Sequence, residues 1–394
     1  MGEDVYLRLR EFLDGMPGGY PELKSGLELR ILEKLFTPEE AELTMRLRLF
    51  PEPPEVIARR CAMDEAEASR TLASMARRGL ILNLFAGEKV FYQATQFILG
   101  IYEYHVDSID REFAEMMEEF LEETAETGLH ENALKQFRVV PVNASISSTS
   151  TVASYDQAVR LVSGQKLAAV HPCICRKEKL LLGYDCEKPH ESCLTFGVGA
   201  QYIINNGKGR EISIDQALGY LKQADENAQI LMPSNSREVI NICCCCGCCC
   251  GLLRMLKMED RPADHVRSAF QAEIDPARCA SCGTCLDRCQ VAAIVENENA
   301  MKVDLARCIG CGLCVTTCPE EAASLLPRLS AADVPINYFH MLSGLAKDRG
   351  LGFGKLSPMM KMTKIPLLLK MLPYLYRSGL GRPMVNEMAK RGWV

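Results

Sequence analysis

Eight of the twenty cysteines fall in one doubled pattern, which limits what the C-terminal part of the chain can fold into. The first run reads Cys279-x2-Cys282-x2-Cys285-x3-Cys289. The second starts 29 residues later and reads Cys308-x2-Cys311-x2-Cys314-x3-Cys318-Pro319. A quartet at this spacing places three thiolates on one tight loop around an iron–sulfur cube, and its fourth cysteine reaches a neighbouring cube. The flanks at 275–278 and 304–307 repeat as well, so we interpret the region as an internal duplication with one half per cluster.

Over residues 270–325 this pattern resembles the bacterial two-cluster ferredoxin domain. The resemblance implies two [4Fe–4S] clusters. It assigns the first to Cys279, Cys282, Cys285 and Cys318, and the second to Cys308, Cys311, Cys314 and Cys289. Gln290 departs from the family pattern, which usually has proline there, as at Pro319. This departure removes no ligand, and we expect it to change the local turn and the hydrogen bonds to sulfur.

Two zinc sites are the alternative for this region, because C-x2-C pairs also bind zinc. Zinc needs neither a third evenly spaced cysteine nor a fourth that crosses to another site. We therefore predict iron–sulfur clusters. Segments 293–295 and 301–303, which lie between the two runs, predict a β-hairpin with a polar tip.

A second group of eleven cysteines lies in the middle of the chain. We recognise no secretory signal and expect a reducing compartment, and adjacent cysteines form disulfides only with strain. Metal or cluster ligation is therefore the prediction, and eleven thiols suffice for one or two further clusters. The predicted ligands are Cys173, Cys175, Cys186, Cys193, Cys243, Cys245, Cys246, Cys248, Cys249 and Cys250.

The local pattern predicts how these thiols are presented. Residues 166–170 and 238–242 are short apolar runs, and we expect each to be a strand that ends at a cysteine motif. Cys186 and Cys193 are expected in the loop between them. We also expect helices over 195–205, 213–227 and 252–256, the second opening with a capping box at Ser213.

The middle segment also resembles a family of iron–sulfur proteins of anaerobes. The shared elements are the C-I-C-R motif at 173–176, the P-x-x-x-C-L-x-F-G motif at 189–197 and the polycysteine run at 242–250. Cys244 departs from the family pattern, where asparagine is expected, so it is either a spare thiol or a change in cluster type. The resemblance implies an electron-transfer role.

The N-terminal region predicts a winged helix, with helices over 27–35, 55–61 and 64–78 and a hairpin formed by 80–85 and 90–93. Such folds often bind DNA through the second helix of the helix-turn-helix. Here that helix opens with Asp64, Glu65 and Glu67, and acidic residues at this end repel phosphate. We therefore favour a docking or homodimerising module over DNA binding.

Two further segments are strongly charged. Residues 103–126 contain ten acidic residues and one arginine, and predict an amphipathic helix with either a solvated face or a basic partner. Residues 341–394 contain ten basic and two acidic residues. Their apolar part, 359–394, is interrupted by lysines and prolines and does not fit a membrane span of about 20 apolar residues. Peripheral contact with the inner face of a membrane and packing on protein are the two alternatives for it.

The sequence as a whole predicts an α+β protein with five regions. These are a winged-helix-like domain (1–100), an acidic helical connector (101–140), a cysteine-rich α/β cluster-binding domain (141–265), a dicluster ferredoxin domain (266–328) and a basic apolar tail (329–394).

We expect a cytoplasmic electron-transfer protein that serves a redox partner or a larger oxidoreductase complex in an anaerobe. One rival is a redox-sensing transcription regulator. The other is a reductase that acts through an open site on a middle-domain cluster.

Overall fold

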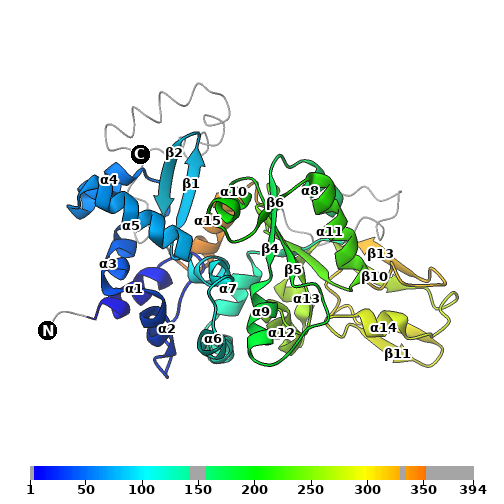
Figure 1. The fold of residues 1–394 in the computed structure, drawn as a ribbon. Helices are drawn as coiled ribbons and strands as arrows, with labels where there is room; N and C mark the ends of the chain where they lie inside the picture. Colours follow the sequence, from blue (N-terminus) through cyan, green and yellow to red (C-terminus); the bar gives the residue numbers. More distant parts are fainter. Residues whose placement is uncertain (1–3, 142–156, 329–333, 352–394) are drawn as a thin grey trace.

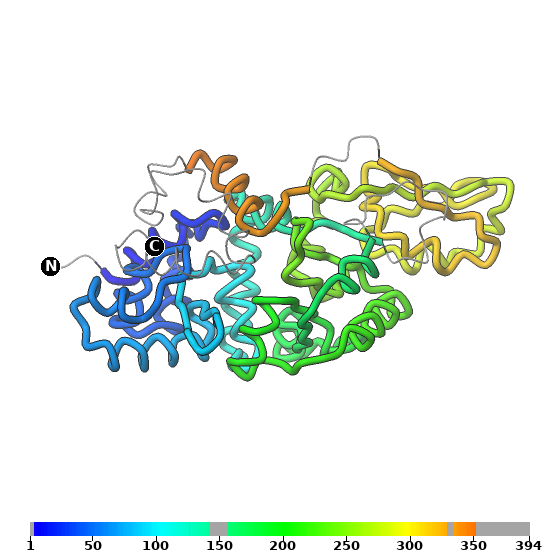
Figure 2. Tube along the Cα trace, turned by 90° about the horizontal axis from the view of Figure 1, so that it is seen from above, coloured from blue at the N-terminus to red at the C-terminus, as the bar shows by residue number. Residues whose placement is uncertain are grey.

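The computed structural model describes residues 4–141, 157–328 and 334–351, and it confirms the expected α+β class. Figures 1 and 2 show an elongated molecule whose parts follow the order of the sequence, except that the last described helix returns to the N-terminal end. The N-terminal helices lie at one end, the cysteine-rich sheet lies in the middle, and the region of the doubled cysteine pattern lies at the other end (Figure 2).

The N-terminal part combines helices with one β-hairpin. Its elements are α1 (Val5–Asp14), α2 (Leu27–Leu35), α3 (Pro38–Arg46), α4 (Pro54–Cys61), α5 (Glu65–Arg78), β1 (Leu82–Ala86) and β2 (Lys89–Gln93). Helix α5 begins where the Asp64 side chain accepts a hydrogen bond from the Glu67 amide, and it ends at Gly79, whose φ of 94° suits glycine. The three helices and the hairpin expected from the sequence are present. Their identification as a winged helix stays a prediction.

The acidic segment is divided into short elements. These are η1 (Phe97–Ile101), η2 (Glu103–His105), α6 (Arg111–Glu123), η3 (Thr124–Glu126) and α7 (Leu129–Leu134). The expected amphipathic helix is present as α6, which starts at Arg111 because Asp110 caps it. Its apolar face is buried in the same core as the N-terminal helices. On its polar face, Glu118 pairs with Lys179 and Arg254 of the middle region, so part of the acidic charge has a partner within the chain.

The middle region is built on a five-stranded antiparallel sheet with the order β6-β4-β5-β8-β7. The strands are β4 (Ala168–Pro172), β5 (Glu191–Phe196), β6 (Arg210–Ile212), β7 (Ile230–Pro233) and β8 (Asn241–Cys245). The helices are α8 (Ala158–Ser163), α9 (Ile174–Leu181), α10 (Val198–Asn205), α11 (Ile214–Glu226) and α12 (Gly251–Met258). Alternate residues of β4 point to opposite faces, so Ala168 and Val170 pack in the core that contains α8 and α11, whereas Ala169 packs with α10.

Several boundaries differ from the sequence-based expectation. Strands β4 and β8 lie two to three residues later than 166–170 and 238–242. Strand β4 still ends just before Cys173, whereas β8 continues in the sheet through Cys243 to Cys245. Buried cysteine behaves as a small apolar residue and does not end a strand. The helix expected over 195–205 starts only at Val198, since Thr195 and Phe196 belong to β5. The capping box at Ser213 and the helix at 252–256 are confirmed as parts of α11 and α12.

The C-terminal region is a compact set of hairpins and turns. It contains α13 (Pro262–His265), β9 (Arg267–Ser268), β10 (Phe270–Ile274), α14 (Thr284–Arg288), β11 (Ile294–Asn297), β12 (Ala300–Val303) and β13 (Ala323–Pro327). Strand β10 pairs with β13, and β11 pairs with β12 as the expected hairpin. Strand β9 pairs in parallel with β3 (Arg138–Val139).

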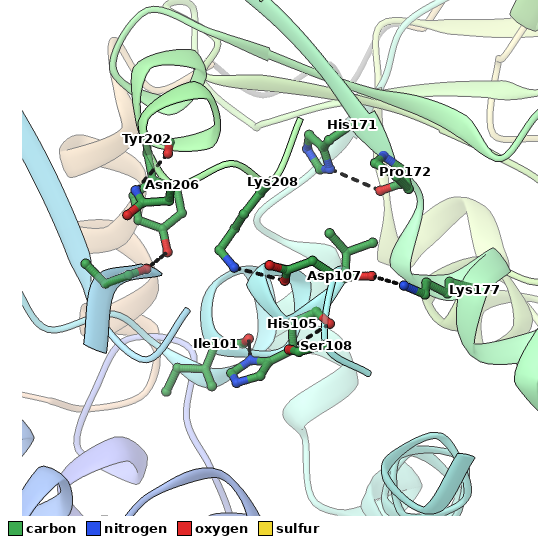
Figure 3. Close-up of polar contacts among 12 residues, drawn as sticks. Ile101, His105, Asp107, Ser108, His171, Pro172, Lys177, Tyr202, Asn206 and Lys208 are labelled. Carbon is green, nitrogen blue, oxygen red and sulfur yellow. Dashed lines mark hydrogen bonds and ion pairs between the residues drawn. The ribbon is translucent and has the colours of Figure 1, made fainter. Parts of the chain in front are cut away.

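The N-terminal part and the acidic segment are attached to the middle region through polar contacts with buried side chains. Asn83 of β1 and Asn206, the C-cap residue of α10, exchange side-chain hydrogen bonds. Lys208, which is almost fully buried, forms an ion pair with Asp107 at 3.0 Å (Figure 3). Because a buried ammonium without a partner is costly, this pair fixes how the two parts meet.

The last described helix, α15 (Tyr338–Asp348), lies beside the N-terminal part (Figure 2). Arg349 forms an ion pair with Asp14 at 2.9 Å, and the rings of Phe50 and Phe339 stack at 6.0 Å. The alternatives for the apolar tail concern residues 359–394, which lie outside the described residues. No helix among the described residues has the length and apolarity needed to cross a membrane.

The buried side chain of His105, in η2, provides a test of how the acidic segment packs. Its Nδ1 lies 2.6 Å from the Ile101 carbonyl oxygen (Figure 3), and burial lowers the pKa of the ring to about 4. The unfolded chain binds the proton near pH 6.5, so stability is full above that pH and is lost as the pH falls towards 4. We predict that His105→Asn, which keeps a donor and does not titrate, removes up to about 3 kcal/mol of this pH dependence.

The measurement is the thermal midpoint of the anaerobic protein between pH 7.5 and 5. His340→Asn at an exposed position serves as the control and should keep the wild-type slope. If the thermal midpoint depended on pH equally in His105→Asn and the wild type, His105 would not be the group that causes the loss of stability at low pH.

Candidate metal centre

The first cysteine quartet surrounds a common cavity in the C-terminal region. Cys279, Cys282, Cys285 and Cys318 all line it, together with apolar side chains that include Ile274 and Met301. The resemblance assigned these same four cysteines to one cluster. Cys282 is exposed, so this quartet reaches the surface of the molecule.

The second quartet is more deeply buried. Cys308 and Cys314 are buried, and Cys289 and Cys311 are partly buried against the same core. Burial raises the pKa of the Cys314 thiol to about 12, and the nearby thiols of Cys308 and Cys289 add to the rise. Thiols that raise one another's pKa in this way need a metal to stay deprotonated.

The hydrogen bonds to the cysteine sulfur atoms repeat with the same 29-residue spacing as the sequence. The amides of Ala293 and Ala322 donate to the Sγ atoms of Cys289 and Cys318, at 3.1 and 3.2 Å. The amides of Ala272 and Met301, which are also 29 residues apart, donate to Cys308 and Cys279, at 3.3 and 3.4 Å. Amide donors to ligating sulfur stabilise the thiolate and influence the potential of a bound cluster.

In the middle region six thiols form a closed ring, which we call the six-thiol ring. Each member interacts with two others. The order around the ring is Cys173, Cys175, Cys250, Cys245, Cys243 and Cys193. The directions of the pKa shifts alternate around the ring because the side chains of neighbouring members interact. The pKa values are lowered for Cys173, Cys250 and Cys243, and raised for Cys175, Cys245 and Cys193.

Strand alternation explains which cysteines enter the ring. Cys193 of β5 stands opposite Cys243 of β8 in the sheet register, and Cys245 lies two residues further on the same face. Cys244 points to the other face, where it is buried in the apolar core beneath α8 and α11. Burial raises the pKa of Cys244 to about 12. Cys244 is therefore a packing residue and not a member of the ring.

The other ring members come from helix starts. Cys173 and Cys250 occupy the N-cap positions of α9 and α12, and Cys175 lies in the first turn of α9. The partial positive charge at a helix N-terminus favours a thiolate there.

The remaining four predicted ligands form a second group, which we call the four-thiol cluster. Its members are Cys186, Cys246, Cys248 and Cys249, whose sulfur atoms all lie within 4.8 Å of one another. The Cys186 sulfur is 3.9 Å from that of Cys246 and 3.6 Å from that of Cys248. The hydrogen bond from Cys249 and the charge of Arg176 lower the pKa of Cys246 to about 4, although burial acts in the opposite direction.

Arg176 lies between the two groups of thiols. Its side chain is 1% exposed and donates to the carbonyl oxygens of Pro189 and Cys244, at 2.9 and 2.8 Å. Burial disfavours its charge, but the thiolates of Cys173 and Cys246 raise its pKa above the ordinary value. Its positive charge offsets negative charge on thiolates of both groups.

The sequence did not reveal this division of the ten thiols into six and four. It placed Cys193 in a loop, whereas this cysteine lies in strand β5, which is what brings it opposite Cys243. It also assigned no role to Arg176, although the arginine belongs to the C-I-C-R motif. Gln290 was identified only as a departure from proline. In the structure its side-chain Oε1 accepts a hydrogen bond from the Gly247 amide at 2.8 Å, which connects the C-terminal region to the polycysteine loop.

The two fields of cysteines share an apolar core, and we predict that they nevertheless hold separate clusters. We predict that Cys311→Ser removes iron from the C-terminal region and leaves the middle-region signal in place, whereas Cys173→Ser does the opposite. The reason is that no ring thiol interacts with a thiol of either C-terminal quartet in the contacts described above. The measurement is iron content with low-temperature electron paramagnetic resonance (EPR) of both variants. Loss of a C-terminal signal in Cys173→Ser would mean that the fields share a cluster.

Comparison with known proteins supports the assignment of the C-terminal region. The family model described as a 4Fe-4S binding domain matches residues 301–324, which contain the whole second cysteine run. No curated protein and no solved structure matches the chain. The chain therefore has a 4Fe–4S binding domain near its C-terminus and a polycysteine cluster in the middle.

Proposed function

We propose that the chain is an electron-transfer protein with two [4Fe–4S] clusters in the C-terminal region and at least one further iron–sulfur cluster in the six-thiol ring. The observation that carries the proposal is one apolar core shared by both fields. Cys245 and Cys250 of the ring are buried in the same core as Cys308 and Cys314 of the second quartet. A continuous, water-poor connection between redox centres suits electron transfer.

The residues present fit such groups. Each C-terminal quartet supplies the four thiolates that a [4Fe–4S] cluster takes, and the ring supplies six. Bound clusters would provide one-electron redox chemistry. The chain's own contributions are the thiolate ligands, the amide donors to sulfur and the exclusion of water by the shared core.

Exposure indicates where a redox partner can exchange electrons with the chain. The first quartet includes the exposed Cys282, whereas the second is buried next to the ring. We propose that electrons from a redox partner enter at the first quartet, pass to the second and reach the ring. The protein would then serve as a redox subunit or carrier of a larger oxidoreductase in the cytoplasm of an anaerobe. The N-terminal part would be a winged-helix module for docking or dimerisation.

We predict that the anaerobically purified chain holds at least about twelve irons and passes electrons to its middle-region cluster through the second quartet. Cys311→Ser should sharply slow reduction of that cluster by a low-potential protein donor, which cannot enter the core. The measurement is freeze-quench EPR of the middle-region signal.

Cys61→Ser changes a lone cysteine in α4 and should keep the wild-type rate. A chain with only about eight irons, or an unchanged rate in Cys311→Ser, would contradict the proposal.

A second candidate function is reduction of a small substrate at the ring. A cavity beside both thiol groups is lined by Tyr102, Glu103, Cys175, Glu178 and Cys249, among others. Burial raises the pKa of Glu103 to about 8 and that of Glu178 to about 7, so both carboxyls can hold protons near neutral pH. A change in the EPR signal of the reduced cluster on adding cyanide or carbon monoxide would favour this function, since it requires an open iron site.

The rival function of a DNA-binding regulator makes a different prediction. The start of α5 exposes Asp64, Glu65 and Glu67, and Arg78 of the same helix is paired with Glu40. We predict no sequence-specific DNA binding tighter than about 10⁻⁶ M at physiological salt in either redox state. Footprinting with a library of sequences checks this. A specific footprint that is lost in Arg70→Ala or Arg77→Ala would reverse the preference in favour of the regulator.

A further inference from the structure

The distance between sulfur atoms limits what a group of thiolates can surround. A tetrahedral ion with metal–sulfur bonds of about 2.3 Å has its four sulfur atoms about 3.8 Å apart. A [4Fe–4S] cluster places four irons and four sulfides among its thiolates, so those thiolates must stand farther apart. The sulfur–sulfur spacing therefore distinguishes a single ion from a cluster.

The four-thiol cluster has the spacing of a single ion. Its sulfur–sulfur distances are 3.9 Å for Cys186 and Cys246, 3.6 Å for Cys186 and Cys248, and 3.8 Å for Cys248 and Cys249. Among the described residues, no other set of three or more histidine, cysteine or acidic side chains has all its ligand atoms within 4.8 Å. The quartets of the C-terminal region and the six-thiol ring are thus more open.

The surroundings of the four-thiol cluster suit an anionic thiolate site. Four thiolates around a divalent ion carry a net charge of −2, which needs compensation. The buried guanidinium of Arg176 faces Cys246, and the Tyr184 hydroxyl hydrogen-bonds to Cys248. Hydrogen bonds and charges of this kind hold ligating thiolates in place.

A bound ion would join parts of the chain that are distant in sequence. Cys186 lies in the segment between α9 and β5, whereas the other three thiols follow β8 directly. Gly247, in the middle of that run, receives two further contacts: its amide donates to Gln290, and its carbonyl accepts from Lys257 at 3.3 Å. The ion would fix the polycysteine loop against the segment of Cys186 and, through Gln290, against the C-terminal region.

We propose that the four-thiol cluster binds one tetrahedral metal ion and is a structural site separate from every iron–sulfur cluster of the chain. Zn²⁺ and a mononuclear iron ion share this ligand chemistry. All four ligands come from the protein, so no position is open for a substrate, as in structural zinc sites. The site goes beyond the proposed electron transfer, because it concerns a different set of thiols.

The test compares the wild-type chain with Cys186→Ser and with Cys244→Ala, purified anaerobically. We expect Cys186→Ser to lose about one metal ion per chain and no acid-labile sulfide. Cys244→Ala should lose neither, because Cys244 lies in the polycysteine run but packs on the opposite face of β8. Zinc or iron in the elemental analysis identifies the ion.

X-ray absorption at the zinc edge of the wild-type chain provides a second test, which does not depend on how well the variants fold. It should show a sulfur shell at about 2.3 Å and no neighbouring metal. If the ion is iron, the wild-type chain should instead show the high-spin ferric EPR signal of an isolated thiolate site.

Loss of about four irons together with sulfide in Cys186→Ser would overturn the proposal, as would a wild-type chain with neither zinc nor the isolated ferric signal. These outcomes differ from failure of the electron-transfer proposal. That failure would appear as missing iron in the ring or as an unchanged rate in Cys311→Ser.

Discussion

The alternation of side chains along β8 is the constraint on which the metal-binding region depends. A strand sends successive residues to opposite faces, so Cys243 and Cys245 face the ring while Cys244 enters the apolar core. A register shift of one residue would bury two ring thiols in that core and expose Cys244 to the ring. The pairing of β8 with β5 on one side and β7 on the other prevents such a shift, and the pairing with β5 also brings Cys193 opposite Cys243.

The two halves of the C-terminal region show how duplication builds a pair of sites. The same amide-to-sulfur bonds occur 29 residues apart, and two of them cross from one half to the other. In the ligand assignment that the resemblance implies, each half supplies three thiols to one cluster and its fourth thiol to the other, so the halves must fold together. Gln290 departs from the duplicated pattern because it has a second role. Proline has no side-chain acceptor, whereas glutamine reaches the Gly247 amide and joins this region to the polycysteine loop.

The sequence alone was sufficient to predict the features that depend on local residue patterns. The cysteine runs, the 293–303 hairpin, the capping box of α11 and the apolar face of α6 all depend on residues close together in the chain. It could not predict which of the ten middle cysteines meet, because that depends on the long-range pairing of β5 with β8. The expected C-terminal end of β8 was wrong for a related reason. Cysteine was interpreted only as a ligand, whereas Cys243 to Cys245 also continue the sheet.

The ring and the four-thiol cluster also interact electrostatically. Both groups concentrate negative charge in a region with little water, and Cys175 of the ring packs against the four-thiol cluster. Two anionic sites so close together repel each other unless a cation lies between them. Arg176 fills this position, and its planar guanidinium can donate to carbonyl oxygens on two sides while it faces thiolates of both groups. A lysine there would present a single point charge without the same fixed set of donors. The C-I-C-R motif therefore supplies two thiols of the ring together with a positive charge that lowers the repulsion between the ring and the four-thiol cluster.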